Sequence, residues 1–212
     1  MTQALRKLTT FDEFVAKYPD ETGKRYELHD GVVVEMPQPT GEHEEVTGFL
    51  AFEITRECIR LNLPYFIPKT ALVKPPENES AYSPDVLLLN RPNLANEPLW
   101  KKESTVIQGI SIPLIIEVVS TNWRDDYLKK YADYVRVASR REVMGIPEYW
   151  IVDYAGLGGR EFIGNPKQPT ILVCCLEEGE YTVRKFRGDN RIQSVTFPDL
   201  NLTAQQIFNA SL

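Results

Sequence analysis

Two acidic residues interrupt apolar stretches of this sequence in the same way. Asp85 stands between Pro84 and the run Val-Leu-Leu-Leu, and Glu117 stands between Leu-Ile-Ile and Val-Val. An ionised carboxylate buried in such surroundings costs several kcal/mol unless a metal ion or a paired cation compensates it. Two such acids on neighbouring strands would also repel each other, and a divalent cation between them removes both costs. The sequence therefore predicts a metal site held by Asp85 and Glu117.

Each of these acids also has a simpler interpretation. Taken alone, Asp85 or Glu117 could form a buried ion pair or cap the end of a strand, with no role in chemistry. Because the same sequence context occurs at both positions, we favour one shared metal site over two unrelated structural acids.

A segment after Glu117 carries residues that could complete this site. Asp126, Lys130 and Tyr134 follow one another at four-residue spacing, which places them on one face of a helix. Lys129 lies about 100° around that helix, so only one of the two lysines can face the acids. Asp126 and Lys130 could instead form an exposed pair worth about 0.3–0.5 kcal/mol. We interpret Lys130 as the lysine directed at the carboxylates.

Two further polar residues are weaker candidates. Glu27 lies between Tyr26 and Leu28 in a strand-like stretch and could simply face solvent. His43 lies among glutamates in the first turn of a long helix and could be a solvated cap. The chain has only two histidines, too few for a multi-histidine metal site, and its sequence contains no glycine-rich phosphate loop, nucleophile elbow or Cys/His zinc spacing.

The stretches around these residues predict the elements that position them. Residues 83–89, 113–119 and 148–153 are apolar runs too short for helices. Their apolar residues point to both faces, as strands covered on both sides require. Helical spacing of apolar residues predicts helices over 42–61 and 125–144.

Turn residues and alternation predict the remaining elements. An Asp-Gly pair predicts the turn of a hairpin over 26–36, and a second hairpin is expected over 170–186. Residues 65–74 are expected to form a strand. Strands alternate with helices early in the chain and hairpins accumulate late, which is typical of an α/β or α+β domain with a mixed sheet. The length of 212 residues, 42% of them hydrophobic, suits a single domain over 1–212.

Composition limits where the protein acts and on what. The formal net charge of −6 argues against a broad nucleic-acid-binding surface but allows a local basic groove. No apolar run approaches the roughly 18 residues of a membrane span, and the first residues lack the layout of a secretory signal. Cys58 and the adjacent pair Cys174 and Cys175 imply no disulfide framework. We therefore expect a cytoplasmic protein with no membrane partner.

The order of the motifs resembles the Uma-type restriction-endonuclease family, which belongs to the PD-(D/E)XK nuclease superfamily. The resemblance runs from about residue 9 to the C-terminal helix, and the combined pattern is more specific than any one of its pieces. The residues that carry it are, in order, Tyr26-Glu27-Leu28-x-Asp30-Gly31, His43, Ser83-Pro84-Asp85, Glu117-Val118-x-Ser120, Asp126-x-x-x-Lys130-x-x-x-Tyr134 and Gly145-Ile146-Pro147-Glu148-Tyr149-Trp150-x-Val152-Asp153.

This resemblance implies a restriction-endonuclease-like fold, with a mixed central sheet flanked by helices, and a phosphodiesterase site that uses Mg²⁺ or, as a substitute, Mn²⁺. In its terms Asp85 belongs to the PD element and Glu117 is the second acid. The superfamily's lysine usually lies two residues after that acid, where this chain has Val119. A valine cannot contact phosphate or activate water, so the role passes to another residue, and Lys130 is the candidate.

The chain departs from the family pattern a second time. Between Tyr134 and Gly145 it carries about two extra helical turns, which include Arg136, Arg140 and Arg141. An insertion of about seven residues is close to two turns and would preserve the helix face. The insertion could be neutral, or it could block or extend a binding surface.

The leading hypothesis is a metal-dependent DNA endonuclease that works as a homodimer, since two symmetric sites cut two strands most simply. Asp85 and Glu117 would hold Mg²⁺, and Lys130 would orient the attacking water or stabilise charge on the phosphate. The supporting residues would be Glu27, His43, Asp126 and Tyr134. The alternatives are a non-catalytic nucleic-acid- or protein-binding module that retains the fold, and a hydrolase acting on RNA or a nucleotide.

Overall fold

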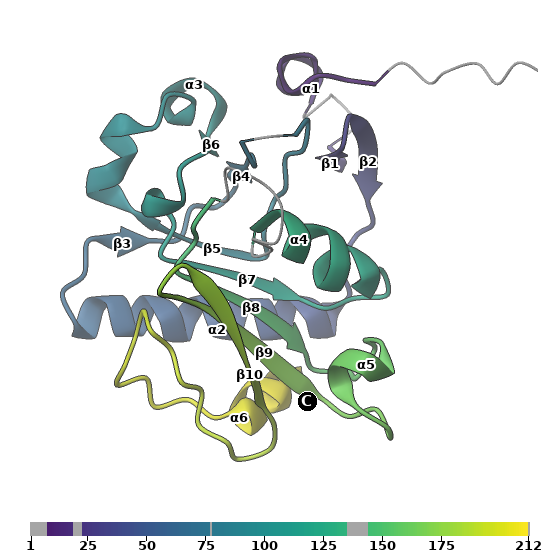
Figure 1. The fold of residues 1–212 in the computed structure, drawn as a ribbon, viewed down its shortest axis with the longest axis vertical. Coiled ribbons are helices and arrows are strands. Elements are labelled where there is room, and N and C mark those ends of the chain that lie inside the picture. Colours follow the sequence, from purple (N-terminus) through teal and green to yellow (C-terminus); the bar gives the residue numbers. More distant parts are fainter. Residues whose placement is uncertain (1–7, 19–22, 77, 135–143, 212) are drawn as a thin grey trace, which may run out of the picture.

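A six-stranded mixed sheet runs through the centre of the molecule (Figure 1). The computed structural model describes residues 8–18, 23–76, 78–134 and 144–211. The strands lie in the order β10-β9-β8-β7-β5-β3, in which β7 and β8 are parallel and the other neighbours antiparallel. Their bounds are β3 Tyr65–Phe66, β5 Val86–Asn90, β7 Leu114–Val118, β8 Glu148–Asp153, β9 Thr170–Glu177 and β10 Glu180–Phe186.

Strand β7 shows how the apolar sequence places an acid inside the protein. Leu114 and Ile116 belong to the core on one face of the sheet, whereas Ile115 and Val119 belong to the core on the other face. Because side chains alternate along a strand, Glu117 points to the same side as Ile115 and Val119. The predicted burial of this strand on both faces is confirmed. The strand places Glu117 on the face of the sheet that holds Ile115 and Val119.

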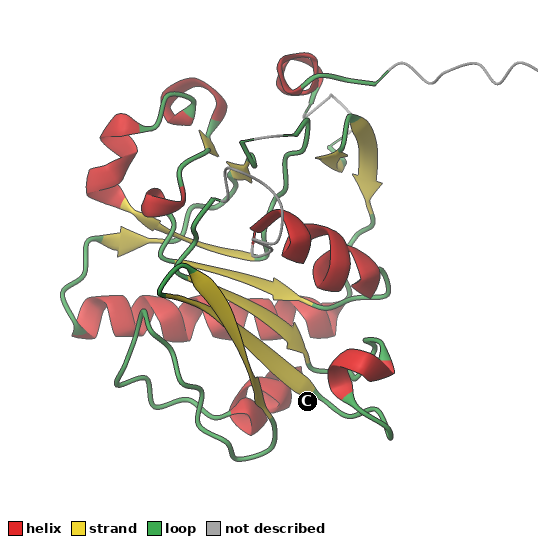
Figure 2. Ribbon diagram, viewed as in Figure 1, coloured by secondary structure: helices red, strands yellow, loops and turns green. Residues whose placement is uncertain are grey.

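Helices cover both faces of the sheet (Figure 2). Helix α2 (Gly41–Arg60) and the short helix α6 (Ala204–Phe208) pack on the face that contains Leu114 and Ile116. The opposite face is covered by η3 (Asp125–Lys130), a π-helix, and by the turn of α-helix that continues it, α4 (Tyr131–Tyr134). Figure 1 shows α2 behind the strands and α4 in front of them.

Helix α2 is fixed at its first turn and along its buried face. The side chain of Thr40 caps the helix by accepting a hydrogen bond of 3.2 Å from the backbone N–H of His43. Val46, Leu50 and Ile54, at helical spacing, are fully buried against the sheet. The cap and this buried stripe together set the position of His43 at the end of the helix nearest the site.

The predicted early hairpin forms a small sheet of its own. Strands β1 (Arg25–His29) and β2 (Val32–Met36) are antiparallel, and both turn residues, Asp30 and Gly31, have positive φ angles, of 49° and 79°. This conformation matches the turn that two-residue hairpins favour. Leu28 bridges to Ala81 ahead of β5, and the core beneath it also holds Phe11 and Phe14 of α1 (Phe11–Lys17).

The segment from 65 to 74 differs from the prediction of one strand. It divides into β3, which joins the edge of the central sheet, and β4 (Leu72–Val73), which pairs in parallel with β6 (Thr105–Val106) in a separate sheet. Pro68 lies between the two strands and has no N–H to donate, which explains why pairing stops there. The connection from β5 to β7 also holds η1 Arg91–Asn96, α3 Trp100–Glu103 and η2 Gly109–Ser111.

The C-terminal part of the chain follows the prediction closely. Strands β9 and β10 form the expected hairpin, and the chain then crosses to α6 and to η4 (Asn209–Ser211). Helix α5 (Arg160–Ile163) connects β8 and β9. The predicted insertion with Arg136, Arg140 and Arg141 lies outside the described residues. Within the residues that are described, no helix is both long and apolar enough to cross a membrane.

Candidate active site

Glu117 is an almost fully buried acid at the centre of the site. It is 1% exposed, and its Oε2 accepts a hydrogen bond of 3.2 Å from the Lys130 ammonium. Its Oε1 is buried and makes no hydrogen bond. Burial raises the pKa of Glu117 well above its ordinary value; Lys130 lowers it but is outweighed. The carboxyl group therefore tends to hold a proton, and one of its oxygens is available to another ligand.

Asp85 lies beside Glu117 because of the strand register. Val86 pairs with Ile116, and Asp85 directly precedes that pair in the antiparallel arrangement of β5 and β7. Its Oδ2 accepts a hydrogen bond of 2.8 Å from the backbone N–H of Val118. The Asp85 side chain is 19% exposed, so it reaches the surface of the site while Glu117 stays beneath it.

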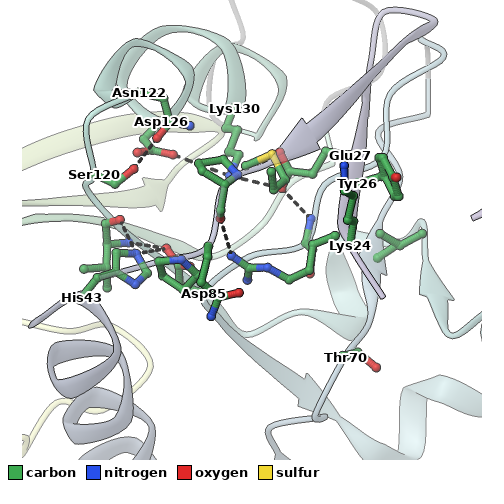
Figure 3. A pocket seen from close by; sticks show the side chains of 18 of the residues that line it. Lys24, Tyr26, Glu27, His43, Thr70, Asp85, Ser120, Asn122, Asp126 and Lys130 are labelled. Carbon is green, nitrogen blue, oxygen red and sulfur yellow. Dashed lines mark hydrogen bonds and ion pairs between the residues drawn. The ribbon is translucent and has the colours of Figure 1, made fainter. Parts of the chain in front are cut away.

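Lys130 is a buried cation surrounded by acids (Figure 3). Its ammonium nitrogen lies 3.2 Å from Glu117 Oε2, 3.4 Å from Glu27 Oε1 and 3.6 Å from Asp126 Oδ1. Burial lowers the pKa of Lys130, but these carboxylates outweigh burial and hold the pKa well above its ordinary value. Lys129 instead lies 3.8 Å from the exposed Asp30. The structure thus places Lys130, rather than Lys129, among the acids.

Glu27 is also buried, contrary to the simpler interpretation that it faces solvent. Its Oε1 accepts a hydrogen bond of 2.9 Å from the backbone N–H of Ser83, and its Oε2 lies 2.8 Å from Nε2 of the buried His29. Burial raises the pKa of Glu27, but Lys130, His29 and Ser83 outweigh burial and bring the pKa below its ordinary value. Glu27 is therefore the ionised partner of Lys130.

Sequence reasoning missed His29. It lies two residues after Glu27 on β1, so both side chains point to the same face of the strand, and the ring of Tyr82 packs edge-on against the imidazole at 5.0 Å between centroids. The spacing of two in a predicted strand was the available signal. The histidine holds Glu27 in place and has no contact with the cavity described below.

His43 is buried as well, and it faces Asp85. Its Nε2 donates to the carbonyl oxygen of Val118 at 3.0 Å and lies 3.5 Å from Asp85 Oδ2. Burial lowers the pKa of His43, but the hydrogen bond and charge of Asp85 outweigh burial, so the pKa is raised. An imidazolium at this position would place positive charge beside Asp85.

Asp126 and Tyr134 come from the same helical segment as Lys130 but differ in what they offer. Burial raises the pKa of Asp126 to about 7, although Lys130 opposes the change. Tyr134 is fully buried, its ring packs edge-on against Tyr82 and Tyr149, and its hydroxyl makes no hydrogen bond. Asp126 therefore belongs to the charged cluster, whereas Tyr134 supports it from the core.

The charges of this cluster do not balance without further cations or protons. Three carboxyl groups, those of Glu27, Glu117 and Asp126, lie within 3.6 Å of one lysine, and Asp85 adds to the repulsion that raises the pKa of Glu117. Two of the three, Glu117 and Asp126, have raised pKa values and so favour protonation. A divalent cation could take the place of those protons.

The oxygen ligands of the site are of the kind that Mg²⁺ prefers, but they are too few to surround the ion. Mg²⁺ commonly keeps several waters and binds through one or two carboxylates, which Asp85 and the unpartnered Oε1 of Glu117 could supply. Within the described part of the chain, no group of three or more histidine, cysteine or acidic side chains is arranged to hold a metal. The residues therefore suit a largely hydrated cation and not an all-protein cage.

A cavity of about 710 Å³ opens over the cluster (Figure 3). Glu27, His43, Asp85, Asp126 and Lys130 line it, and Figure 3 shows them on one side and at its centre, with Lys24 and Tyr26 on the other side. The cavity thus brings five of the seven predicted site residues to one solvent-accessible space. A phosphate there would meet a lysine, a histidine and a carboxylate.

Comparisons with known proteins agree with this architecture. The family model described as "Uma2: Putative restriction endonuclease" matches residues 11–205. The crystal structure of a "putative nuclease belonging to DUF820" from Anabaena variabilis is similar in fold, with a TM-score of 0.65 and 15% identity, covering 96% of this chain and 99% of that chain. No curated protein matches the chain.

These comparisons confirm two predictions made from the sequence. The mixed central sheet with helices on both faces is the fold shared with the solved nuclease-like structure, which at 15% identity is evidence of fold alone. The resemblance stated from the motifs is confirmed by a family match that spans nearly the whole chain. The protein is a member of the Uma2 family.

Proposed function

We propose that this protein is a metal-dependent endonuclease that hydrolyses phosphodiester bonds in DNA. The observation that carries the proposal is the position of Lys130, a buried cation 3.2 Å from Glu117 in a chain that has Val119 where the superfamily usually has its lysine. Val119 is fully buried in the apolar core and takes no part in the charged cluster. Family membership supports a nuclease in the broad sense.

The residues of the chain divide the work between them. Asp85 and Glu117 would hold Mg²⁺, which when bound polarises the phosphate and lowers the pKa of a bound water. Lys130 would orient the attacking water or stabilise the negative charge that develops on the phosphate. Glu27 keeps Lys130 charged and in place, and His43, with its raised pKa, would add positive charge beside Asp85, where the phosphate would bind.

Metal binding followed by calorimetry tests this proposal. Wild-type protein should bind Mn²⁺ and release protons as it does so, because Glu117 and Asp126 have raised pKa values. Asp85→Ala and Glu117→Ala should lose the binding, and the isosteric Asp85→Asn and Glu117→Gln guard against unfolding. Glu180→Ala, at an exposed acid on β10, is the matched control. Equal Mn²⁺ affinity in wild type and all four site variants would refute the proposal.

A second candidate is a non-catalytic nucleic-acid- or protein-binding module with the same fold. The formal net charge of −6 and the valine at position 119 favour it, and so does the lack of a three-ligand metal group in the described residues. Such a module would bind its partner equally well in EDTA and in Mn²⁺ and would cut neither DNA nor RNA. Cleavage of RNA but not DNA would instead support the third candidate, a hydrolase acting on RNA.

Two further features belong to the proposal. We propose a homodimer, in which two copies of the site would serve the two strands of a duplex. We also retain the cytoplasmic location favoured by the cysteine content, and Cys58, Cys174 and Cys175 are all free and buried.

A further inference from the structure

The cavity extends well beyond the charged cluster, and its far side has a different character. That side is lined by Phe14 and Val15 of α1, by Tyr18 just after this helix, and by Tyr26 of β1. Leu72, from β4, also lines it. The single cavity therefore has a charged side, where a phosphate would react, and an aromatic and aliphatic side.

The aromatic residues form one packed group. The ring centroids of Tyr18 and Tyr26 are 4.5 Å apart, and those of Phe14 and Tyr18 are 5.3 Å apart. Both tyrosines are half-buried, so each ring presents part of its surface to the cavity. Nucleic-acid-binding proteins use such rings as platforms on which bases stack, because every base has a π-face.

Three basic side chains also line the cavity. Lys24, Arg25 and Lys102 all line the cavity and are all exposed. Lys24 pairs with Glu35 at 2.8 Å, and Arg25 donates to the carbonyl of Pro37 at 3.3 Å, so both are held at the rim. Lys24 and Arg25 directly precede Tyr26 in the chain and could contact a nucleic-acid backbone there, and Glu42 and Glu103 also line the cavity.

The size of the cavity limits what can enter. A volume of about 710 Å³ lies within the roughly 300–1,000 Å³ of sites that enclose small ligands. A base-paired duplex is much larger than such a ligand and would have to lie across the opening of the cavity. A nucleotide whose base is unpaired and turned out of the stack has the right dimensions.

We propose that this cavity binds an unpaired stretch of DNA, with a base stacked on Tyr18 and Tyr26. The reacting phosphate lies over Asp85, Glu117 and Lys130, a placement that rests on the function proposed above. Lys24, Arg25 and Lys102 neutralise the flanking phosphates. The substrate is single-stranded or locally opened DNA.

Fluorescence anisotropy with a labelled oligonucleotide tests this inference apart from catalysis. Ca²⁺ replaces Mg²⁺, and the same sequence is compared as a single strand and as a duplex. The single strand should bind at least tenfold more tightly. Tyr26→Ala should weaken single-strand binding by about 5- to 150-fold, the range expected from the loss of one base stack. Tyr26→Phe keeps the ring and should bind within about twofold of wild type.

The outcomes separate the two proposals. Equal affinity for single strand and duplex, or unchanged affinity in Tyr26→Ala, would overturn the inference even if the protein cuts duplex DNA. Tight single-strand binding that depends on the Tyr26 ring, without any metal-dependent cleavage, would support the inference and refute the nuclease. Melting temperatures of the Tyr26 variants check that the hairpin remains folded, and Tyr18→Ala against Tyr18→Phe repeats the comparison at the second ring.

Discussion

Among single residues, Lys130 is the most informative, because it is a buried cation whose partners are all buried acids. Lys130 is 3% exposed, and its ammonium group lies within 3.6 Å of three carboxyl groups. A buried cation of this kind is inseparable from the acids around it, because removing one partner leaves the other charges uncompensated. Lys130 therefore contributes to the stability of the folded protein as well as to the proposed chemistry.

We predict that Lys130→Ala lowers turnover of DNA by about 100-fold or more, the scale on which one charge-stabilising donor acts. The same substitution should lower the free energy of unfolding measured in urea, by about 3–5 kcal/mol if the acids stay ionised and by less if they take up protons. Turnover must therefore be measured on the folded fraction, well below the unfolding midpoint.

Lys129→Ala is the matched control. That side chain is 36% exposed and lies 3.8 Å from Asp30, so its loss should change stability by less than about 1 kcal/mol and leave turnover nearly unaltered. Equal turnover in the Lys129 and Lys130 variants would show that the chemistry does not depend on Lys130.

Asp126 makes the stability of the metal-free protein depend on pH. Burial raises its pKa from 3.8 to about 7, so the folded protein binds a proton that the unfolded chain has released. This group's contribution to stability therefore falls as pH rises from about 4 to about 7, by on the order of a few kcal/mol in total. Asp126→Asn should remove that dependence. Urea unfolding in EDTA across this pH range checks it; parallel curves for wild type and variant would contradict it.

At the scale of the element, the helical segment formed by η3 and α4 buries polar side chains and exposes an apolar one, the reverse of what hydropathy suggests. Asp126, Lys130 and Tyr134 point into the protein, whereas Leu128 is 50% exposed. The spacing in the sequence correctly predicted that the three polar residues share a face. It could not predict how deeply this face is buried, because one of the acids that compensate Lys130, Glu27, comes from β1, far away in the chain.

Strand β8 contains a buried acid, Glu148, whose hydrogen bonds serve the fold. Glu148 accepts hydrogen bonds from Trp150 Nε1 at 2.6 Å, from Ser194 Oγ at 2.8 Å and from the backbone N–H of Thr196 at 2.9 Å. Two of these donors belong to the segment between β10 and α6. Glu148 thereby fastens the C-terminal segment to the central sheet.

We predict that Glu148→Ala lowers the free energy of unfolding by about 3 kcal/mol or more, because it leaves several buried donors without an acceptor. Urea unfolding measures the loss, and Glu180→Ala, at an exposed glutamate on β10, should change the free energy of unfolding by less than about 0.5 kcal/mol. Since Glu148 does not line the cavity, Mn²⁺ affinity of the folded variant should match wild type. A loss as small as that of Glu180→Ala would show that the three hydrogen bonds contribute little.

At the scale of the whole molecule, the sequence predicted the parts that depend on local pattern. The apolar strands around Asp85, Glu117 and Trp150 lie in one sheet, and both predicted hairpins are present. The pairing of β4 with β6 and the contact of His29 with Glu27 were not predicted. The pairing depends on how two segments meet in space, and no periodicity in one segment records which other segment it will meet. The contact of His29 with Glu27 is local, and it was missed although the spacing of two was visible in the sequence.

The outer face of α2 carries exposed apolar side chains, which we propose as the interface of the dimer. Phe52 and Ile59 are 64% and 75% exposed, and their spacing of seven residues puts them on the same side of the helix. We predict a light-scattering mass of twice the 24.3 kDa of one chain, reduced to the monomer by Phe52→Glu combined with Ile59→Glu. A mass near 24.3 kDa for the wild type across micromolar concentrations would exclude the dimer.

The residues of the site come from two portions of the chain, so the site is complete only when both portions are folded together. Glu27 and His43 precede β3, whereas Asp85, Glu117 and Lys130 all follow β4. The two portions meet through the pairing of β3 with β5, the pairing of β4 with β6 and the hydrogen bond from Ser83 to Glu27. A chain divided between β4 and Ser83 would give two fragments, neither with a complete charged cluster. If the fragments were fused to two other proteins, they would form a split reporter. The DNA cleavage proposed above would then return only when those two proteins bind each other.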